Sequence, residues 1–329
     1  MDGMNLAVPV TTLPRSPVMS AAPQSAPQLA ALPQLDLARV AGHIGAEVRG
    51  LKLHGGLDSS TAAAIRAALY QHKVLFFRGQ GHLDDATQEA LAPIFGGAPV
   101  NHPTVPVVAG TNHILELDSR RGGRANSWHT DVTFVDAYPQ VSLLRAVTVP
   151  QFGGDTLWAN TARAYATLSP ELRELADRLW AVHSNEYDYA ERSQDDVSET
   201  DRKRNRKQFT STLYETEHPL VRVHPVTGER SLVLGHFFKR FVGSTASESA
   251  ALFRTLQDHV IRHEHTVRWR WSAGDLVAWD NRATQHYAIN DYGSQVRIVR
   301  RVTVDGDVPV SVDGRRSTTR IIGPQQAAA

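Results

Sequence analysis

Short apolar runs separated by polar, glycine-rich turns recur along most of the chain. Residues 74–77 form a continuous apolar run that Arg78-Gly79 ends, which is typical of a buried strand. Further strands are predicted at 40–48, 114–117, 141–149, 221–223, 232–234, 266–271, 275–279 and 296–304. Helical spacing or capping residues predict helices at 59–69, 84–95, 170–180 and 246–263. Many short strands with helices between them predict a mainly β fold, a sandwich or barrel with flanking helices.

Three segments lack such periodicity. Residues 1–34 are rich in Ala, Pro, Ser and Gln and have too few apolar side chains to offset their ordering entropy, so we expect a disordered tail. Residues 184–212 are highly charged, and the simplest interpretation is a solvated loop. Because so long a loop in a compact domain is often functional, it is also a candidate mobile lid. With a C-terminal tail at 314–329, a single domain spans 35–313.

Composition narrows the class of protein. The 329 residues carry 35 basic and 34 acidic side chains, so the net charge of +1 gives no reason to expect nucleic acid or a membrane surface as partner. Without cysteine, a metal ion must be held by histidines and carboxylates. No apolar run is long enough to span a membrane, and Pro9, Pro14 and Pro17 interrupt the N-terminus where a signal peptide would be apolar. We expect a cytoplasmic protein.

Residues 127–134, Ser-Trp-His-Thr-Asp-Val-Thr-Phe, hold the first candidate chemistry. Their β-branched and aromatic residues predict a strand over 128–134. Because side chains on a strand alternate between two faces, His129 and Asp131 would share one face and could bind one metal ion. Taken alone, this short pattern favours a polar pair that faces solvent on a half-buried strand.

A third candidate ligand is His286, which follows an apolar strand. Two histidines and one carboxylate that leave three positions open form the facial triad of non-haem Fe(II) oxygenases. A zinc hydrolase uses a similar set with one open position and a general base nearby. Taken alone, His286 would be interpreted as a hydrogen-bonded core histidine.

Two arginines favour the oxygenase. Arg297 and Arg301 are separated by an even number of residues on one predicted strand, so both side chains would lie on the same face. A buried arginine needs an anionic partner, and the planar guanidinium fits a carboxylate such as that of 2-oxoglutarate. Exposed arginines on an edge strand are the alternative, which we accept for Arg300. Thr156, after a Gly-Gly turn, could add a hydroxyl to the same carboxylate or be structural.

From about Leu37 to Asp313 the chain resembles the taurine dioxygenase family of Fe(II)/2-oxoglutarate-dependent oxygenases, and within it most closely the bacterial alkylsulfatases. The blocks that carry the resemblance are residues 128–134, 153–156 (Gly-Gly-Asp-Thr), 267–271 (Val-Arg-Trp-Arg-Trp) and 279–287 (Trp-Asp-Asn-Arg-Ala-Thr-Gln-His-Tyr). The resemblance implies a double-stranded β-helix (jelly-roll, cupin-like) core. It implies that His129, Asp131 and His286 bind iron and that Thr156 and Arg297 bind the co-substrate carboxylate. It also implies that His102, Arg301 and the amide of Val132 bind a sulfo group of the substrate.

Two departures from the taurine enzyme concern the substrate. Val105 and Ala125 stand where that enzyme has a tyrosine and an asparagine that meet the ammonium group of taurine. Apolar residues there would leave a buried ammonium unpaired, but they suit an alkyl chain. The loop His102-Pro-Thr-Val-Pro106 also reads as it does in the alkylsulfatases.

The predicted activity is therefore oxidative cleavage of an alkyl sulfate ester to an aldehyde and inorganic sulfate. Fe(II) is the expected cofactor, with 2-oxoglutarate and O₂ as co-substrates and succinate and CO₂ as co-products. The alternatives are a dioxygenase of the same class for sulfonates such as taurine or for aryloxyacids, a metal-dependent sulfate-ester hydrolase, and a non-catalytic cupin-like module. The hydrolase would leave Arg297 without a role. We also expect a homo-oligomer, a dimer or tetramer.

Overall fold

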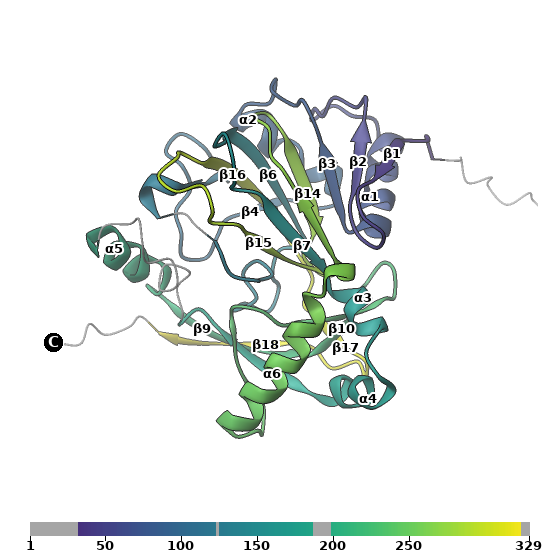
Figure 1. The fold of residues 1–329 in the computed structure, drawn as a ribbon, viewed down its shortest axis with the longest axis vertical. Helices are drawn as coiled ribbons and strands as arrows, with labels where there is room; N and C mark the ends of the chain where they lie inside the picture. Colours follow the sequence, from purple (N-terminus) through teal and green to yellow (C-terminus); the bar gives the residue numbers. More distant parts are fainter. Residues whose placement is uncertain (1–31, 123–124, 187–198, 324–329) are drawn as a thin grey trace, which may run out of the picture. The chain divides into compact units, whose positions relative to one another are not determined.

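The computed structural model describes residues 32–122, 125–186 and 199–323, and these described residues form one compact unit. Its largest sheet has eight strands (Figure 1). In order across the sheet they are β1 (Asp36–Arg39), β2 (Ala46–Arg49), β3 (Val74–Phe77), β14 (Leu276–Asp280), β6 (Val141–Thr148), β16 (Ile298–Val304) and β4 (Pro99–Val100), with β5 (Leu115–Asp118) also paired to β16.

A second sheet packs against one face of the first. It contains β13 (Thr266–Trp269), β7 (Thr156–Asn160) and β15 (Thr284–Ala288). Alternating side chains of β14 divide between two cores, because Val277 and Trp279 pack with the tryptophans of the second sheet whereas Leu276 belongs to the core beneath α1. Two facing β layers with helices outside agree with the fold class predicted from sequence.

Two smaller sheets complete the β structure. One has the order β12 (Phe238–Phe241), β8 (Trp180–Ser184), β9 (Leu213–Pro219) and β18 (Thr318–Gly323). The other has the order β11 (Arg230–Leu232), β10 (Val221–Val223) and β17 (Val310–Ser311). The predicted hairpin at 221–234 is the β10–β11 pair.

The helices begin where the sequence places capping residues. Asp58 accepts a hydrogen bond from the amide of Thr61 at the start of α1, and Thr245 and Glu248 form a capping box at α6. The helices are α1 (Ser59–His72), α2 (Asp85–Glu89), α3 (Thr161–Ala166), α4 (Pro170–Arg178), α5 (Glu199–Phe209) and α6 (Ala246–Val260), with 3₁₀ turns η1 (Ala92–Phe95), η2 (Ser119–Arg121) and η4 (His263–His265). No helix among the described residues is long and apolar enough to cross a membrane.

Two segments differ from the structure predicted for them. The helix expected at 84–95 ends at Glu89, and η1 follows separately around Pro93, which has no N–H to donate within a continuous helix. Part of the loop expected at 184–212 is helix α5, where the Glu199–Lys203 pair (2.7 Å) supports a helix that has little apolar periodicity. Residues 187–198 lie outside the described part of the chain, so the lid itself stays a prediction.

The two ends of the chain were both predicted to be tails. The C-terminal tail expected from residue 314 is wrong, because β18 pairs with β9 and places Thr319 opposite Thr216. At the N-terminus, residues 32–34 are exposed and have no regular structure. The remainder of the expected tail, residues 1–31, lies outside the described residues.

Candidate metal and anion site

The segment 127–134 is not the strand that its composition predicts. Only His129 makes a β-bridge, with His286 of β15, through backbone hydrogen bonds of 3.0 and 2.8 Å. A turn follows over residues 131–134, and Val132 has a φ of 59°, in the left-handed region. Tertiary contacts thus override the strand preference of the β-branched residues here.

The turn nevertheless brings the predicted ligands together. Oδ1 of Asp131 lies 3.8 Å from Nε2 of His129 and 3.9 Å from Nε2 of His286. Nδ1 of His129 donates to the carbonyl of Ser127 (2.7 Å), which orients the ring. All three ligand residues are buried, and they form the one metal-ligating group found among the described residues.

The protonation of this group suits a metal. Burial lowers the pKa of His129 to about 3 and that of His286 to about 4, so both imidazoles are neutral near pH 7. Burial by itself would raise the pKa of Asp131, but the positive charge of Arg301 and the hydrogen bond from Ser142 hold that pKa below its usual range. Neutral imidazole and ionised carboxylate are the forms that bind metal ions.

Arg297 lines the same cavity as the cluster and lies immediately before β16. Its side chain is buried, and it donates from Nε to the carbonyl of Gly154 (3.0 Å) and from Nη2 to Oγ1 of Thr156 (3.3 Å). No acidic side chain in the described ranges pairs with it, since Asp155 pairs with Arg268 instead (2.6 Å). A buried guanidinium without an acidic partner indicates a site for an anion.

Arg301 also lines this cavity and is buried. Its partner is Oδ1 of Asp131, which the turn supplies from a distant part of the chain. The prediction for Arg300 was wrong: β16 has neighbours on both sides, and Arg300 pairs with Glu116 (2.8 Å) and Asp85 (2.6 Å).

His102 is half-buried near Arg301. Its Nδ1 accepts hydrogen bonds from the amides of Thr104 (3.2 Å) and Val105 (3.1 Å). Burial, with the charge of Arg301, lowers the pKa of His102 to about 3, so the ring is neutral. Its one N–H is then on Nε2, a hydrogen-bond donor.

All the predicted site residues line one cavity of about 920 Å³. They are His102, Val105, Ala125, His129, Asp131, Val132, Thr156, His286, Arg297 and Arg301. The sequence did not predict the apolar wall formed by Leu115 and Leu117 of β5 and Phe209 of α5. Phe209 is the last residue of a charged helix, and its burial depends on distant aromatic neighbours such as Phe134 (centroids 5.7 Å apart).

The turn at Val132 is held from behind by β9. Nε2 of His218 contacts the carbonyl of Thr133 (2.7 Å), and Oγ1 of Thr216 donates to the carbonyl of Phe134 (2.6 Å). These two side chains therefore fix the backbone immediately after Val132, whereas Asp131 lies immediately before it.

Both side chains in turn contact the C-terminal part of the chain. Nδ1 of His218 contacts Oγ of Ser317 (2.7 Å), and Oγ1 of Thr216 contacts Oγ1 of Thr319 (2.8 Å). No pattern in the sequence indicates these contacts, since they join side chains far apart in the chain.

Comparisons with known proteins agree with this geometry. Residues 36–303 match the model of the family described as "Taurine catabolism dioxygenase TauD, TfdA family". A Pseudomonas putida protein named alpha-ketoglutarate-dependent sulfate ester dioxygenase is 63% identical over 286 residues, 87% of this chain and 94% of that protein. An alkylsulfatase of Acinetobacter baylyi is 57% identical over 288 residues, 88% of this chain and 90% of that protein.

Among solved structures, a taurine dioxygenase from Burkholderia xenovorans superposes with a TM-score of 0.73 at 40% identity, covering 88% of this chain and 95% of that one. This similarity confirms the jelly-roll fold predicted from the sequence. The chain belongs to the TauD, TfdA family of dioxygenases.

Proposed function

We propose that this protein is an Fe(II)- and 2-oxoglutarate-dependent dioxygenase that cleaves alkyl sulfate esters. The observation that carries the proposal is one cavity lined by a buried His-Asp-His cluster and by two arginines with different partners. One arginine suits the carboxylate of a co-substrate, and the other suits a sulfate group. The names of the Pseudomonas and Acinetobacter relatives support this choice of substrate.

His129, Asp131 and His286 would hold the iron. Two neutral imidazoles and one carboxylate match the ligand preferences of Fe(II), and three protein ligands leave positions for co-substrate and O₂. With O₂ and 2-oxoglutarate, the bound iron supplies the oxidant that replaces a C–H bond beside the ester oxygen by C–OH.

Arg297 and Thr156 bind the distal carboxylate of 2-oxoglutarate. The guanidinium and the hydroxyl already contact each other, and Nε1 of Trp271 donates to Oγ1 of Thr156 (2.9 Å). With its lone pairs engaged by these donors, the Thr156 hydroxyl directs its own proton toward the carboxylate. Arg297 provides the positive charge for this carboxylate, because no acidic side chain among the described residues pairs with its guanidinium.

Arg301, His102 and the amide of Val132 bind the sulfate. Each is a hydrogen-bond donor, as a permanent anion requires, because Nε2 of His102 carries its proton. Held in this way, the sulfate places the adjacent carbon beside the iron ligands. The hydroxylated carbon then expels hydrogen sulfate as its hydroxyl becomes a carbonyl, so the products are aldehyde and inorganic sulfate.

The rest of the cavity selects the alkyl group. Val105, Ala125, Leu115 and Phe209 offer apolar surface, and the carboxylates in the lining apart from Asp131, Glu116 and Asp118, are already paired with Arg300 and Arg120. Transfer of a methylene from water to such a surface contributes about 0.8 kcal/mol. Binding energy therefore favours alkyl sulfates over taurine.

Sulfate release from hexyl sulfate tests the proposal. We expect release only when Fe(II), 2-oxoglutarate and air are all present, with aldehyde, sulfate and succinate formed in equal amounts. Taurine, assayed in parallel by sulfite release, should react poorly. Release of sulfate without oxygen or 2-oxoglutarate would show a hydrolase and refute the proposal.

A further inference from the structure

A buried chain of hydrogen bonds ends on the carboxylate of Asp131. Nε1 of Trp279 donates to Oδ1 of Asn281 (2.9 Å), and Nδ2 of Asn281 donates to Oγ of Ser142 (2.8 Å). Oγ of Ser142 donates to Oδ2 of Asp131 (2.6 Å). None of these four side chains is more than 2% exposed.

The direction of every bond in this chain follows from its first member. An indole N–H can only donate, so it identifies the oxygen of the Asn281 amide and turns the NH₂ group toward Ser142. Because the Ser142 oxygen accepts from that group, its own proton is available for Asp131. Oδ2 of Asp131 is thereby fixed as an acceptor, and the carboxylate is held ionised and in one orientation.

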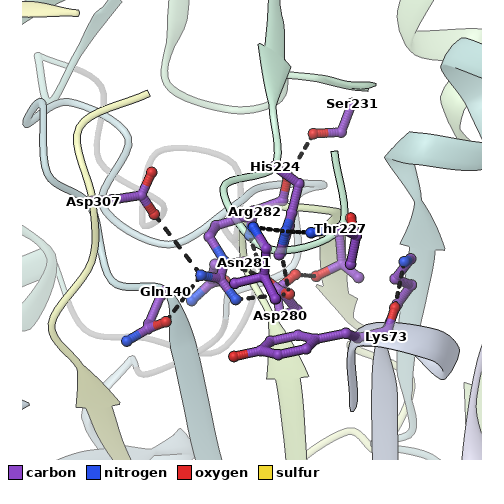
Figure 2. A network of polar contacts seen from close by, with 12 residues as sticks. Lys73, Gln140, His224, Thr227, Ser231, Asp280, Asn281, Arg282 and Asp307 are labelled. Atoms are coloured by element: carbon purple, nitrogen blue, oxygen red, sulfur yellow. Dashed lines mark hydrogen bonds and ion pairs between the residues drawn. The ribbon is translucent and has the colours of Figure 1, made fainter. Parts of the chain in front are cut away.

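Asn281 lies in a turn between charged side chains that contact one another and their surroundings, as Figure 2 shows. Its neighbours Asp280 and Arg282 form a buried ion pair (2.9 Å), and Nε2 of His224 contacts Asp280 (2.9 Å). The backbone amide of Asn281 donates to the carbonyl of Gln140 (2.9 Å). The turn therefore gives the Asn281 side chain little freedom to follow a movement of Asp131.

We infer that Ser142 and Asn281 are positioning residues that make Asp131 a one-oxygen metal ligand. Ser142 occupies Oδ2, whereas Oδ1, which Arg301 also contacts, is the oxygen that lies near both histidine nitrogens. A carboxylate that bound iron through both oxygens would take one of the positions that 2-oxoglutarate and O₂ require. This inference rests on the proposed function, since it concerns the same metal.

The test uses Co(II) as a probe and the full-length metal-free protein. Ser142→Ala should weaken Co(II) binding by about 10- to 100-fold, the usual effect of losing a hydrogen bond to a metal ligand. It should also change the visible absorption of bound Co(II), because the released carboxylate can bind through both oxygens. Ser142→Thr keeps the hydroxyl and should restore both properties.

Two further variants separate positioning from general damage. Ser249→Ala removes a buried serine hydroxyl in α6 that accepts from the amide of Phe241 (3.1 Å), and it should leave Co(II) affinity and spectrum unchanged. Asn281→Leu should have a smaller effect than Ser142→Ala. Because the two residues act in series, the double variant should be no worse than Ser142→Ala alone.

The outcomes are distinguishable. Wild-type affinity and spectrum in Ser142→Ala, or additive losses in the double variant, would overturn the inference and leave the proposed function intact. Failure of the wild-type protein to bind Co(II) or Fe(II) would overturn the proposed function, and this inference with it.

Discussion

Replacing Arg297 by methionine should separate co-substrate binding from stability. Methionine keeps much of the length of the side chain and removes its charge. In the described structure the guanidinium contacts the carbonyl of Gly154 and the hydroxyl of Thr156 and has no acidic partner. In the protein without ligand, this charge therefore contributes little to the free energy of unfolding. Burial disfavours the charged guanidinium and lowers the pKa of Arg297.

The magnitude follows from these contacts. Truncating one partner of a desolvated charge pair costs about 2–5 kcal/mol of binding free energy, and the low end corresponds to about a 30-fold higher Kd for 2-oxoglutarate. At 100 times the wild-type Kd, 2-oxoglutarate stabilises the wild-type protein by about 2.7 kcal/mol but the variant by only about 0.9 kcal/mol. Without ligand, the two proteins should differ by less than about 1 kcal/mol, because the lost hydrogen bonds offset the removal of a buried charge.

Urea unfolding of the Co(II)-loaded protein, with and without 2-oxoglutarate, measures both quantities. Arg270→Met is the matched control, since Arg270 is an exposed arginine just beyond β13. Equal stabilisation of Arg297→Met and wild type by 2-oxoglutarate would refute the assignment of this arginine.

The remaining predictions concern other parts of the site. Arg301→Met should raise the KM for hexyl sulfate at least about 10-fold and leave 2-oxoglutarate affinity within about threefold, as initial rates will show; equal losses for both would mean one shared anion site. Val105→Tyr should lower kcat/KM for decyl sulfate more than for butyl sulfate, because it narrows the apolar wall. Burial lowers the pKa of His218 to about 3, so below pH 6.5 the unfolded chain takes up a proton that the folded chain does not. His218→Gln should therefore flatten the fall in unfolding free energy between pH 6.5 and 5 by up to about 1.4 kcal/mol per pH unit in urea titrations. Thr319→Val should raise the KM for hexyl sulfate with an unchanged circular dichroism spectrum, and an unchanged KM would show that this hydroxyl does not position Val132.

The meeting of His129, Asp131 and His286 could be predicted although the local structure around them could not. The sequence predicts His129 and Asp131 on one face of a strand, whereas the structure places them at a bridge and in the turn after it. That these side chains bind iron stays a prediction, which rests on residue types, two imidazoles and one carboxylate, and not on the strand. Chemistry restricts which residues can bind a metal more tightly than propensity restricts their backbone.

Residues that orient other side chains have no recognisable pattern in the sequence. Ser142 is a small polar residue within the buried strand β6, and its partners Asp131 and Asn281 come from separate segments. The pairing of Arg301 with Asp131 is not evident from the sequence for the same reason, since Asp131 lies in a distant segment. Pairings between distant segments depend on the sheet order, which local patterns do not determine.

Val132 shows how such distant contacts shape the site. A β-branched residue in the left-handed region is strained by about 1–3 kcal/mol, and such residues persist where the surrounding structure determines their conformation. Here His218 and Thr216 hold the next two carbonyls, and Ser317 and Thr319 hold those side chains in turn. The strain lies at the amide proposed to meet the sulfate, which is where local preference is expected to yield to function. The C-terminal strand is therefore part of the support of the site, and this is why a segment with the composition of a tail is ordered.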